Sequence, residues 1–184
     1  HIIRSVTTTE MISLLGQRFG VPVHVTAVGF KYIAPLMLEY DALIGGEESG
    51  GYGFRGHIPE RDGILAGLYF LDYVRRTGKS PSKLLEELYA LVGPHHYDRL
   101  DQELAPTDRA RVAAVLEQLE PARAGDADVH LVDRTDGVRL VLRDGSWLLF
   151  RLSGTEPLVR IYAEAESAER VQTLLAQGRC LLGL

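Results

Sequence analysis

The sequence predicts a chain in two parts: an α/β domain with a mixed, mostly parallel sheet and helices, followed by a smaller α+β domain with an antiparallel sheet. Alternating strand-like and helix-like hydrophobic patterns through about residue 95 indicate the first part. Short apolar strands separated by Asp-Gly turns indicate the second. We expect domains over 1–95 and 96–184, with an irregular connection between His95 and Asp101.

The elements of the first part follow from caps, breakers and periodicity. Thr7 and Glu10 have the spacing of a capping box at the start of a helix. Alternating apolar residues predict a strand over 21–27, and a short helix is expected over 31–40 with Pro35 near its start. The remaining elements are a strand over 42–44, a helix from Ile64 to Gly78, and a helix that Ser80-Pro81 opens and Gly93-Pro94 stops.

The second part has a different pattern. Its first helix carries Val112, Val115, Leu116 and Leu119 and ends at Pro121. Strands are expected near 129–133, 138–143, 147–152 and 158–164. Ser167 is placed to cap a closing helix with an apolar face. Because the strands are joined by short turns, we expect them to pair antiparallel.

Composition excludes several classes of protein. The chain is 46% apolar and 24% charged with a net charge of −5, which is typical of a globular protein and not of a disordered one. A negative balance without a basic stripe argues against nucleic-acid binding. The single Cys180 rules out an internal disulfide. There is no apolar run long enough for a membrane span and no basic-then-apolar leader, so we expect a cytoplasmic protein without a membrane partner.

The most informative stretch lies between the last two expected strands. Arg151 and Arg160 can each fork onto phosphate oxygens, and Ser153 and Thr155 add hydroxyl donors. Gly154 allows close approach of backbone amides to an anion. These features predict a phosphate-binding loop. The alternative is a tight hairpin with a surface arginine at each end.

A second glycine-rich stretch follows the apolar run that ends at Ile44. Its Glu47, Glu48 and Ser49 lie where an open α/β sheet presents ligands, and carboxylate with hydroxyl suits a polyol. Adjacent residues of an extended segment point to opposite faces, so the two glutamates should not act on one substrate as an acid/base pair. The alternative is a glycine-rich turn with two solvated acids.

Four ordered stretches together resemble the alpha-D-phosphohexomutase family, the phosphoglucomutases and phosphomannomutases. They are Thr26 to Ile33, Gly45 to Gly50, Arg55 to Gly63, and Arg151 to Thr155 with Tyr162-Ala163-Glu164. The resemblance covers essentially the whole chain but only the second half of the family: most of its third domain and all of its fourth. The family's phosphoserine loop and aspartate-rich magnesium loop have no counterpart here. The resemblance therefore implies no catalytic residue and no metal ligand in this chain, with Mg²⁺ bound in the half that is missing.

The resemblance also implies roles for individual residues. The expected sugar-binding residues are Lys31, Glu47, Ser49 and Arg61. The expected phosphate-binding residues are Arg151, Ser153, Gly154, Thr155 and Arg160. Many relatives have lysine where this chain has Arg61, and the two cations bind differently, so that contact is not carried over in detail.

Two further positions are open to two interpretations each. Asp62 is either a helix N-terminal charge or a ligand. His95-His96 suggests a metal site, but nothing else with ligand spacing lies nearby, which favours the surface of a domain linker.

The implied function is interconversion of hexose 1-phosphate and hexose 6-phosphate through a phosphoserine enzyme. Glucose 1,6-bisphosphate would be intermediate and activator, and the partners would be the hexose phosphate and the missing N-terminal domains. The Glu47-to-Gly50 sequence is similar to the glucose or dual glucose/mannose branches. This chain alone is expected to be inactive. The alternatives are a non-catalytic sugar-phosphate-binding module and a two-domain scaffold with no ligand.

Overall fold

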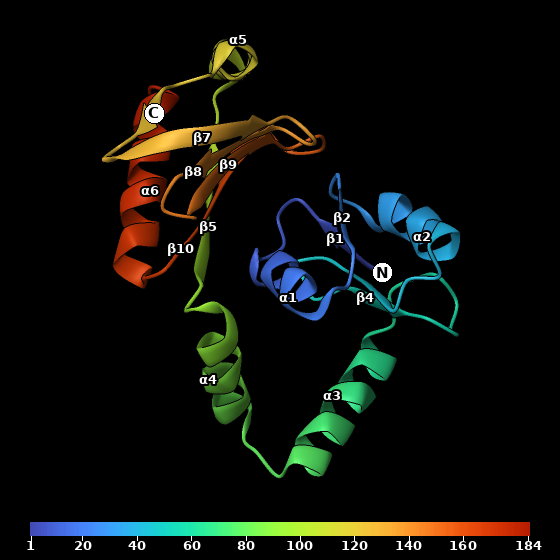
Figure 1. The fold of residues 1–184 in the computed structure, drawn as a ribbon. Coiled ribbons are helices and arrows are strands. Elements are labelled where there is room, and N and C mark those ends of the chain that lie inside the picture. The colour runs from blue at the N-terminus through green and yellow to red at the C-terminus, as the bar shows by residue number, and fades with distance from the viewer. The chain divides into compact units, whose positions relative to one another are not determined.

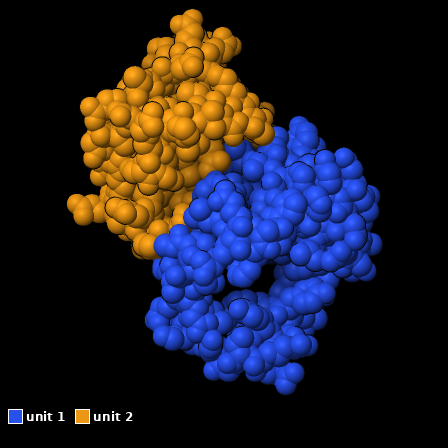
Figure 2. Space-filling model, in the orientation of Figure 1, with its two compact units in different colours: residues 1–93 blue, residues 94–184 orange.

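The chain folds into two compact units, residues 1–93 and 94–184, in a computed structural model that describes all 184 residues (Figure 1). Figure 2 colours the first unit blue and the second orange. Each unit has a hydrophobic core of its own. The predicted fold class is confirmed: an α/β unit with a mixed, mostly parallel sheet precedes a unit built on an antiparallel sheet. No helix is long and apolar enough to cross a bilayer.

Unit 1 contains a four-stranded sheet and four helices. Its elements are β1 (Ile2–Ser5), α1 (Met11–Phe19), β2 (Val23–Thr26), α2 (Phe30–Glu39), β3 (Ile44–Gly46), β4 (Tyr52–Phe54), α3 (Gly63–Thr77) and α4 (Pro81–Val92). The strand order is β2-β1-β3-β4. β1 pairs in parallel with β2 and β3, and β4 returns antiparallel to β3. The loops after β1, β2 and β3 therefore gather at one edge of the sheet.

The core of unit 1 lies where α2 packs on β1 and β3. Its buried residues are Ile3, Phe30, Ile33, Met37 and Ala42. Gly45 is required there, because an added Cβ would lie 2.5 Å from Ile33 Cγ2 and from Met37 Sδ. The close packing of α2 on this glycine fixes the start of the loop that follows β3.

Two details expected for unit 1 are wrong. Glu10 is the N-cap residue of α1 and makes no side-chain cap, so the Thr7–Glu10 capping box does not form. The Glu10 carboxylate instead binds the buried Arg4, which is a stronger electrostatic partner than a backbone amide. Pro35 lies inside α2 and not near its start. The helix continues through it because the apolar face of α2 is buried on both sides of the proline.

The end of α3 and the start of α4 lie where the sequence predicts them, but the exposure of the two helices could not be predicted. Gly78 ends α3 with a left-handed φ of 67°, and the Ser80 hydroxyl caps α4. Neither helix has a buried residue. The large apolar side chains exposed on α3 are Ile64, Leu68, Tyr69, Phe70, Leu71 and Tyr73.

Unit 2 is a six-stranded antiparallel sheet with two helices. Its elements are β5 (His96–Glu103), α5 (Pro106–Gln118), β6 (Arg123–Ala124), β7 (Ala127–Asp133), β8 (Val138–Leu142), β9 (Trp147–Leu152), β10 (Leu158–Ala165) and α6 (Ala168–Leu181). The strand order is β5-β10-β9-β8-β7-β6. Alternate residues of β8, β9 and β10 form one core with the apolar faces of α5 and α6. Both helices therefore bury the same face of the sheet.

The expectation of an irregular connection between His95 and Asp101 is wrong. Residues 96–103 form β5, which pairs antiparallel with β10 in the register Leu100 to Ile161. Leu100 is the residue of this strand that packs against the core. The strand is otherwise polar, so hydrogen bonding to β10 and not hydrophobic alternation defines it.

Candidate functional site

In unit 2, the expected phosphate loop joins β9 to β10. Arg151 and Arg160 lie directly opposite each other on these antiparallel strands, so their side chains leave the same face of the sheet. That face is opposite to the helix-covered one, since the flanking Phe150 and Val159 belong to the core. The side chains of Arg151 and Arg160 are 21% and 25% exposed. Two guanidinium groups are thus partly exposed at the base of one loop.

Ser153 shapes this loop from inside. The residue is 2% exposed, and its Oγ accepts hydrogen bonds from the amides of Glu156 at 3.1 Å and Thr155 at 3.4 Å. Gly154 and Thr155 are exposed at the tip. The hydroxyl of Ser153 therefore holds the turn, while its proton is left to donate. The assignment of these residues to phosphate stays a prediction.

Carboxylates accompany both arginines of the loop. Arg151 Nε donates to Asp136 Oδ2 at 2.9 Å, and Arg160 Nη2 donates to Glu156 Oε2 at 2.7 Å. Arg109, on α5, donates from Nη2 to the carbonyl of Ser153 at 2.8 Å. Sequence reasoning missed both Asp136 and Arg109, because their distance along the chain gives no signal of these contacts.

In unit 1, the loop after β3 turns its first glutamate inward. Glu47 is 5% exposed, and its Oε1 accepts a hydrogen bond from the Gly29 amide at 2.9 Å. Its Oε2 lies 3.7 Å from Arg61 Nη1. The stem of Arg61 crosses Gly51, where an added Cβ would lie 2.5 Å from Arg61 Cδ. The structure therefore brings Glu47 and Arg61 together, and Gly51 makes room for the arginine.

The other two expected sugar-binding residues are exposed. Ser49 lies in the turn between β3 and β4. Lys31 lies in the first turn of α2, with its Nζ 4.9 Å from the centre of the Tyr32 ring. The structure records no contact between either side chain and Glu47. Their roles as sugar ligands stay predictions.

Asp62 caps α3. Its Oδ1 accepts a hydrogen bond from the Leu65 amide at 2.9 Å, and its Oδ2 lies 3.0 Å from His57 Nε2. The Leu65 amide is the main reason that the pKa of Asp62 lies below its ordinary value. Of the two interpretations of Asp62, the structure thus shows the helix N-terminal charge.

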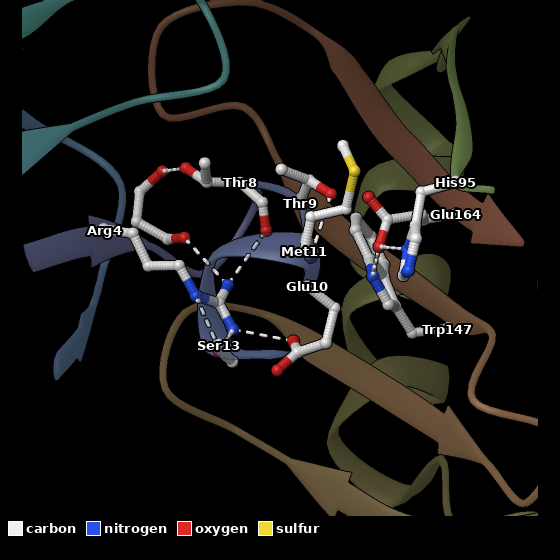
Figure 3. A network of polar contacts seen from close by, with 10 residues as sticks. Arg4, Thr8, Thr9, Glu10, Met11, Ser13, His95, Trp147 and Glu164 are labelled. Carbon is white, nitrogen blue, oxygen red and sulfur yellow. Dashed lines mark hydrogen bonds and ion pairs between the residues drawn. The ribbon is translucent and has the colours of Figure 1, made fainter. Parts of the chain in front are cut away.

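A buried arginine supports the loop that follows β1. Arg4 is 1% exposed and donates to the carbonyl of Thr8 at 2.9 Å, to Ser13 Oγ at 2.9 Å and to Glu10 Oε2 at 2.6 Å (Figure 3). A buried guanidinium needs such a full set of partners. We interpret this network as structural, since it fixes the threonine-rich turn at the carboxyl edge of the sheet.

In unit 2, His95 forms part of a second buried polar group. Glu164 is 1% exposed, and its Oε1 lies 3.0 Å from His95 Nδ1 and 3.2 Å from Trp147 Nε1, which donates to it (Figure 3). The expectation that His95 lies on the surface of a linker is wrong, because its side chain is only 14% exposed. No group of three or more histidine, cysteine, aspartate or glutamate side chains could hold a metal ion.

Family models match both units. The model described as phosphoglucomutase/phosphomannomutase, alpha/beta/alpha domain III, matches residues 1–92. The model of the phosphoglucomutase/phosphomannomutase C-terminal domain matches residues 102–179. The chain therefore belongs to the phosphoglucomutase/phosphomannomutase family.

Individual relatives support the same family. A phosphoglucomutase/phosphomannomutase of Thermococcus kodakarensis is 32% identical over 98% of this chain and 37% of its own length. Phosphoglucomutase 1 of Drosophila melanogaster is 30% identical over 91% of this chain and 35% of its own length. The crystal structure of a putative phosphomannomutase from Thermus thermophilus superimposes with a TM-score of 0.81, at 38% identity, over 100% of this chain and 36% of that one. The chain thus spans little more than a third of the length of each of these three relatives.

Proposed function

We propose that this chain supplies hexose-phosphate recognition to a phosphohexomutase that interconverts hexose 1-phosphate and hexose 6-phosphate. The observation that carries the proposal is the pair of arginines facing each other across β9 and β10, at the base of a serine-braced, glycine-containing loop. Two arginines at paired positions of neighbouring strands, with an exposed hydroxyl and backbone, suit a phosphate dianion. Because the chain belongs to this family, the phosphate is proposed to be that of a hexose phosphate.

In this proposal, each unit contributes one kind of contact. Arg151, Arg160 and the 153–155 turn bind the phosphate that is not reacting. In unit 1, Glu47 accepts hydrogen bonds from sugar hydroxyls, and Lys31, Ser49 and Arg61 add donors. Phosphoryl transfer depends mainly on positioning and on neutralising charge, so such contacts contribute to rate as well as to affinity.

The reaction itself needs groups outside this chain. In the proposed cycle, a phosphoserine of the preceding domains transfers its phosphoryl group to a free sugar hydroxyl. The serine P–O bond breaks and a sugar P–O bond forms, while the sugar hydroxyl loses a proton and the serine oxygen gains one. The resulting 1,6-bisphosphate reorients, and its other phosphoryl group returns to the serine. The phosphate loop must therefore accept either end of the sugar. Mg²⁺ would bind with the phosphoserine, and no residue here is assigned to it.

The sugar is proposed to be glucose, with or without mannose, from the Glu47-Glu48-Ser49-Gly50 sequence. Calorimetric titration of the chain with glucose 1-phosphate, mannose 1-phosphate and unphosphorylated glucose tests this. We expect saturable binding of the sugar phosphates and none of glucose at the same concentrations. Arg151→Ala should weaken binding by about 2 to 3 kcal/mol, the scale of a charge-assisted pair in a partly buried site. Equal binding by the variant would refute the phosphate loop.

A second assay separates a mutase from a non-catalytic binding module. It measures conversion of glucose 1-phosphate to glucose 6-phosphate by the longer protein that contains this sequence, and by this chain alone. The proposal expects turnover by the former, stimulated by glucose 1,6-bisphosphate, and none by the latter. Phosphosugar binding without turnover in either would favour the binding module.

A further inference from the structure

We propose that Asp136 is the positioning residue of the phosphate loop: it holds Arg151 by its Nε so that the two Nη groups are presented to the ligand. The proposal rests on the function proposed above for Arg151. It rests on geometry within unit 2, where the Asp136 carboxylate accepts the Nε hydrogen bond at 2.9 Å. The two side chains are similarly shielded, with exposed fractions of 22% and 21%.

The turn that carries Asp136 is held by contacts of Asp133 and of Arg134. Asp133 Oδ1 accepts hydrogen bonds from the amide and hydroxyl of Thr135, at 2.9 and 2.6 Å. Arg134 donates to the carbonyls of Leu116 and Leu119, at the end of α5. The first contact shapes the β7–β8 turn from within, and the second ties it to α5. The position of Asp136 is therefore set by the fold and not by Arg151.

Gly137 brings the turn against the strand that carries Arg151. It has a left-handed φ of 82°, and an added Cβ would lie 2.1 Å from the carbonyl oxygen of Phe150 and 3.3 Å from Arg151 Cα. Only glycine allows both the conformation and this approach. The carboxylate of Asp136 is thereby held next to the guanidinium of Arg151.

A guanidinium has two edges that can fork onto an oxyanion. Occupation of Nε by Asp136 removes one edge and leaves the Nη1/Nη2 edge for phosphate. An arginine has many rotamers, and ordering one on binding costs affinity. Because Asp136 already orders Arg151 in the folded protein, that cost does not arise when the ligand binds. The pair is partly accessible from solvent, since neither side chain is fully buried.

The opposite role is also physically possible and makes a contrary prediction. A carboxylate at 2.9 Å partly neutralises Arg151, and a phosphate that had to displace Asp136 would bind better without it. Positioning and competition therefore differ in the sign of the effect of removing Asp136.

The test titrates the chain with inorganic phosphate and with glucose 1-phosphate. Asp136→Ala should weaken binding of both by about 3- to 10-fold, the cost of ordering one long side chain. Asp136→Asn keeps a carbonyl acceptor for Nε and should restore binding to within about 2-fold of the wild type. Asp128→Ala is the matched control, because it removes an exposed carboxylate of the same unit without touching Arg151 or the β7–β8 turn, and it should leave affinity unchanged. Unchanged or tighter binding by Asp136→Ala would overturn the proposal.

A measurement on the unmodified chain decides the question even if Asp136→Ala does not fold. The Nε–H signal of Arg151 in nuclear magnetic resonance spectra reports directly on the bond to Asp136. We expect this proton to stay protected from solvent exchange at saturating phosphate, while the Nη signals shift. Loss of protection on binding would mean that phosphate displaces Asp136, and the positioning role would be wrong. If Arg151→Ala weakens phosphate binding and Asp136→Ala does not, only the positioning role fails; if neither does, the phosphate loop itself fails.

Discussion

Replacing Glu47 with glutamine should test the structural role of its buried contact with Gly29. Glutamine keeps an oxygen that can accept the Gly29 amide, but the hydrogen bond loses its charge. Hydrogen bonds to charged groups contribute about 1.5 to 3 kcal/mol and neutral ones about 0.5 to 1.5, so the expected loss is about 1 kcal/mol. Arg61, at 3.7 Å and 54% exposed, adds little because water screens it.

Thermal melts of the variant provide the measurement. For a unit of this size, about 1 kcal/mol corresponds to a fall in Tm of about 4 to 8 °C. Ser49→Ala is the control in the same loop: Ser49 is exposed, so its replacement should change stability by less than about 0.5 kcal/mol. Both variants should lower the affinity for glucose 1-phosphate.

The two variants can contradict different parts of the reasoning. An unchanged Tm in Glu47→Gln would mean that the buried contact with Gly29 does not hold the loop, and the structural reasoning would be wrong. Unchanged sugar-phosphate affinity in Ser49→Ala, with its stability intact, would remove Ser49 from the proposed sugar site.

Three other changes test separate parts of the structure. Gly51→Ala should weaken glucose 1-phosphate binding with little loss of stability, because the new Cβ displaces the flexible stem of Arg61; unaltered affinity would argue against a ligand role for that arginine. Ser153→Ala should destabilise unit 2 by about 1 to 2 kcal/mol, because two loop amides lose their acceptor. Urea denaturation followed by tryptophan fluorescence measures this, and an unchanged free energy of unfolding would mean that Ser153 does not hold the loop. The cap that Asp62 provides is present above the ordinary aspartate pKa of about 3.9 and is lost as pH falls through the lowered pKa of the folded state. Asp62→Asn should therefore flatten the acid side of the stability profile, and an identical profile would contradict this.

The sequence predicted the fold class, and most elements, from local signals. Ser80 and Ser167 mark helix starts that the structure confirms, because a cap is a contact between near neighbours in the chain. The expected helices over 64–78 and in the second part are present. The polar strand β5 was missed because its sequence lacks hydrophobic alternation.

Local patterns could not reveal how the site residues are held. The glutamate and glycine run predicted a loop after β3, but not that Glu47 would turn inward to Gly29. The sequence suggested two arginines near a turn, but not that Asp136 would lie beside Arg151. Such contacts depend on which strands become neighbours, and that is decided by the whole sheet. The ligand roles of these residues stay predictions until binding is measured.

The place of β5 in the sheet has a consequence for how unit 2 is assembled. The strand comes first in the unit, yet its only partner strand is β10, and the contact between His95 and Glu164 joins residues 69 positions apart. The strands from β6 to β10 follow one another as neighbours and can pair by local closure, whereas β5 must wait until β10 has been synthesised. Until β5 pairs with it, β10 presents an open edge that another chain could pair with. Removing the segment before α5 would leave that edge open permanently, so a version of unit 2 cut at the family-model boundary of residue 102 should aggregate more readily than one that begins at residue 94.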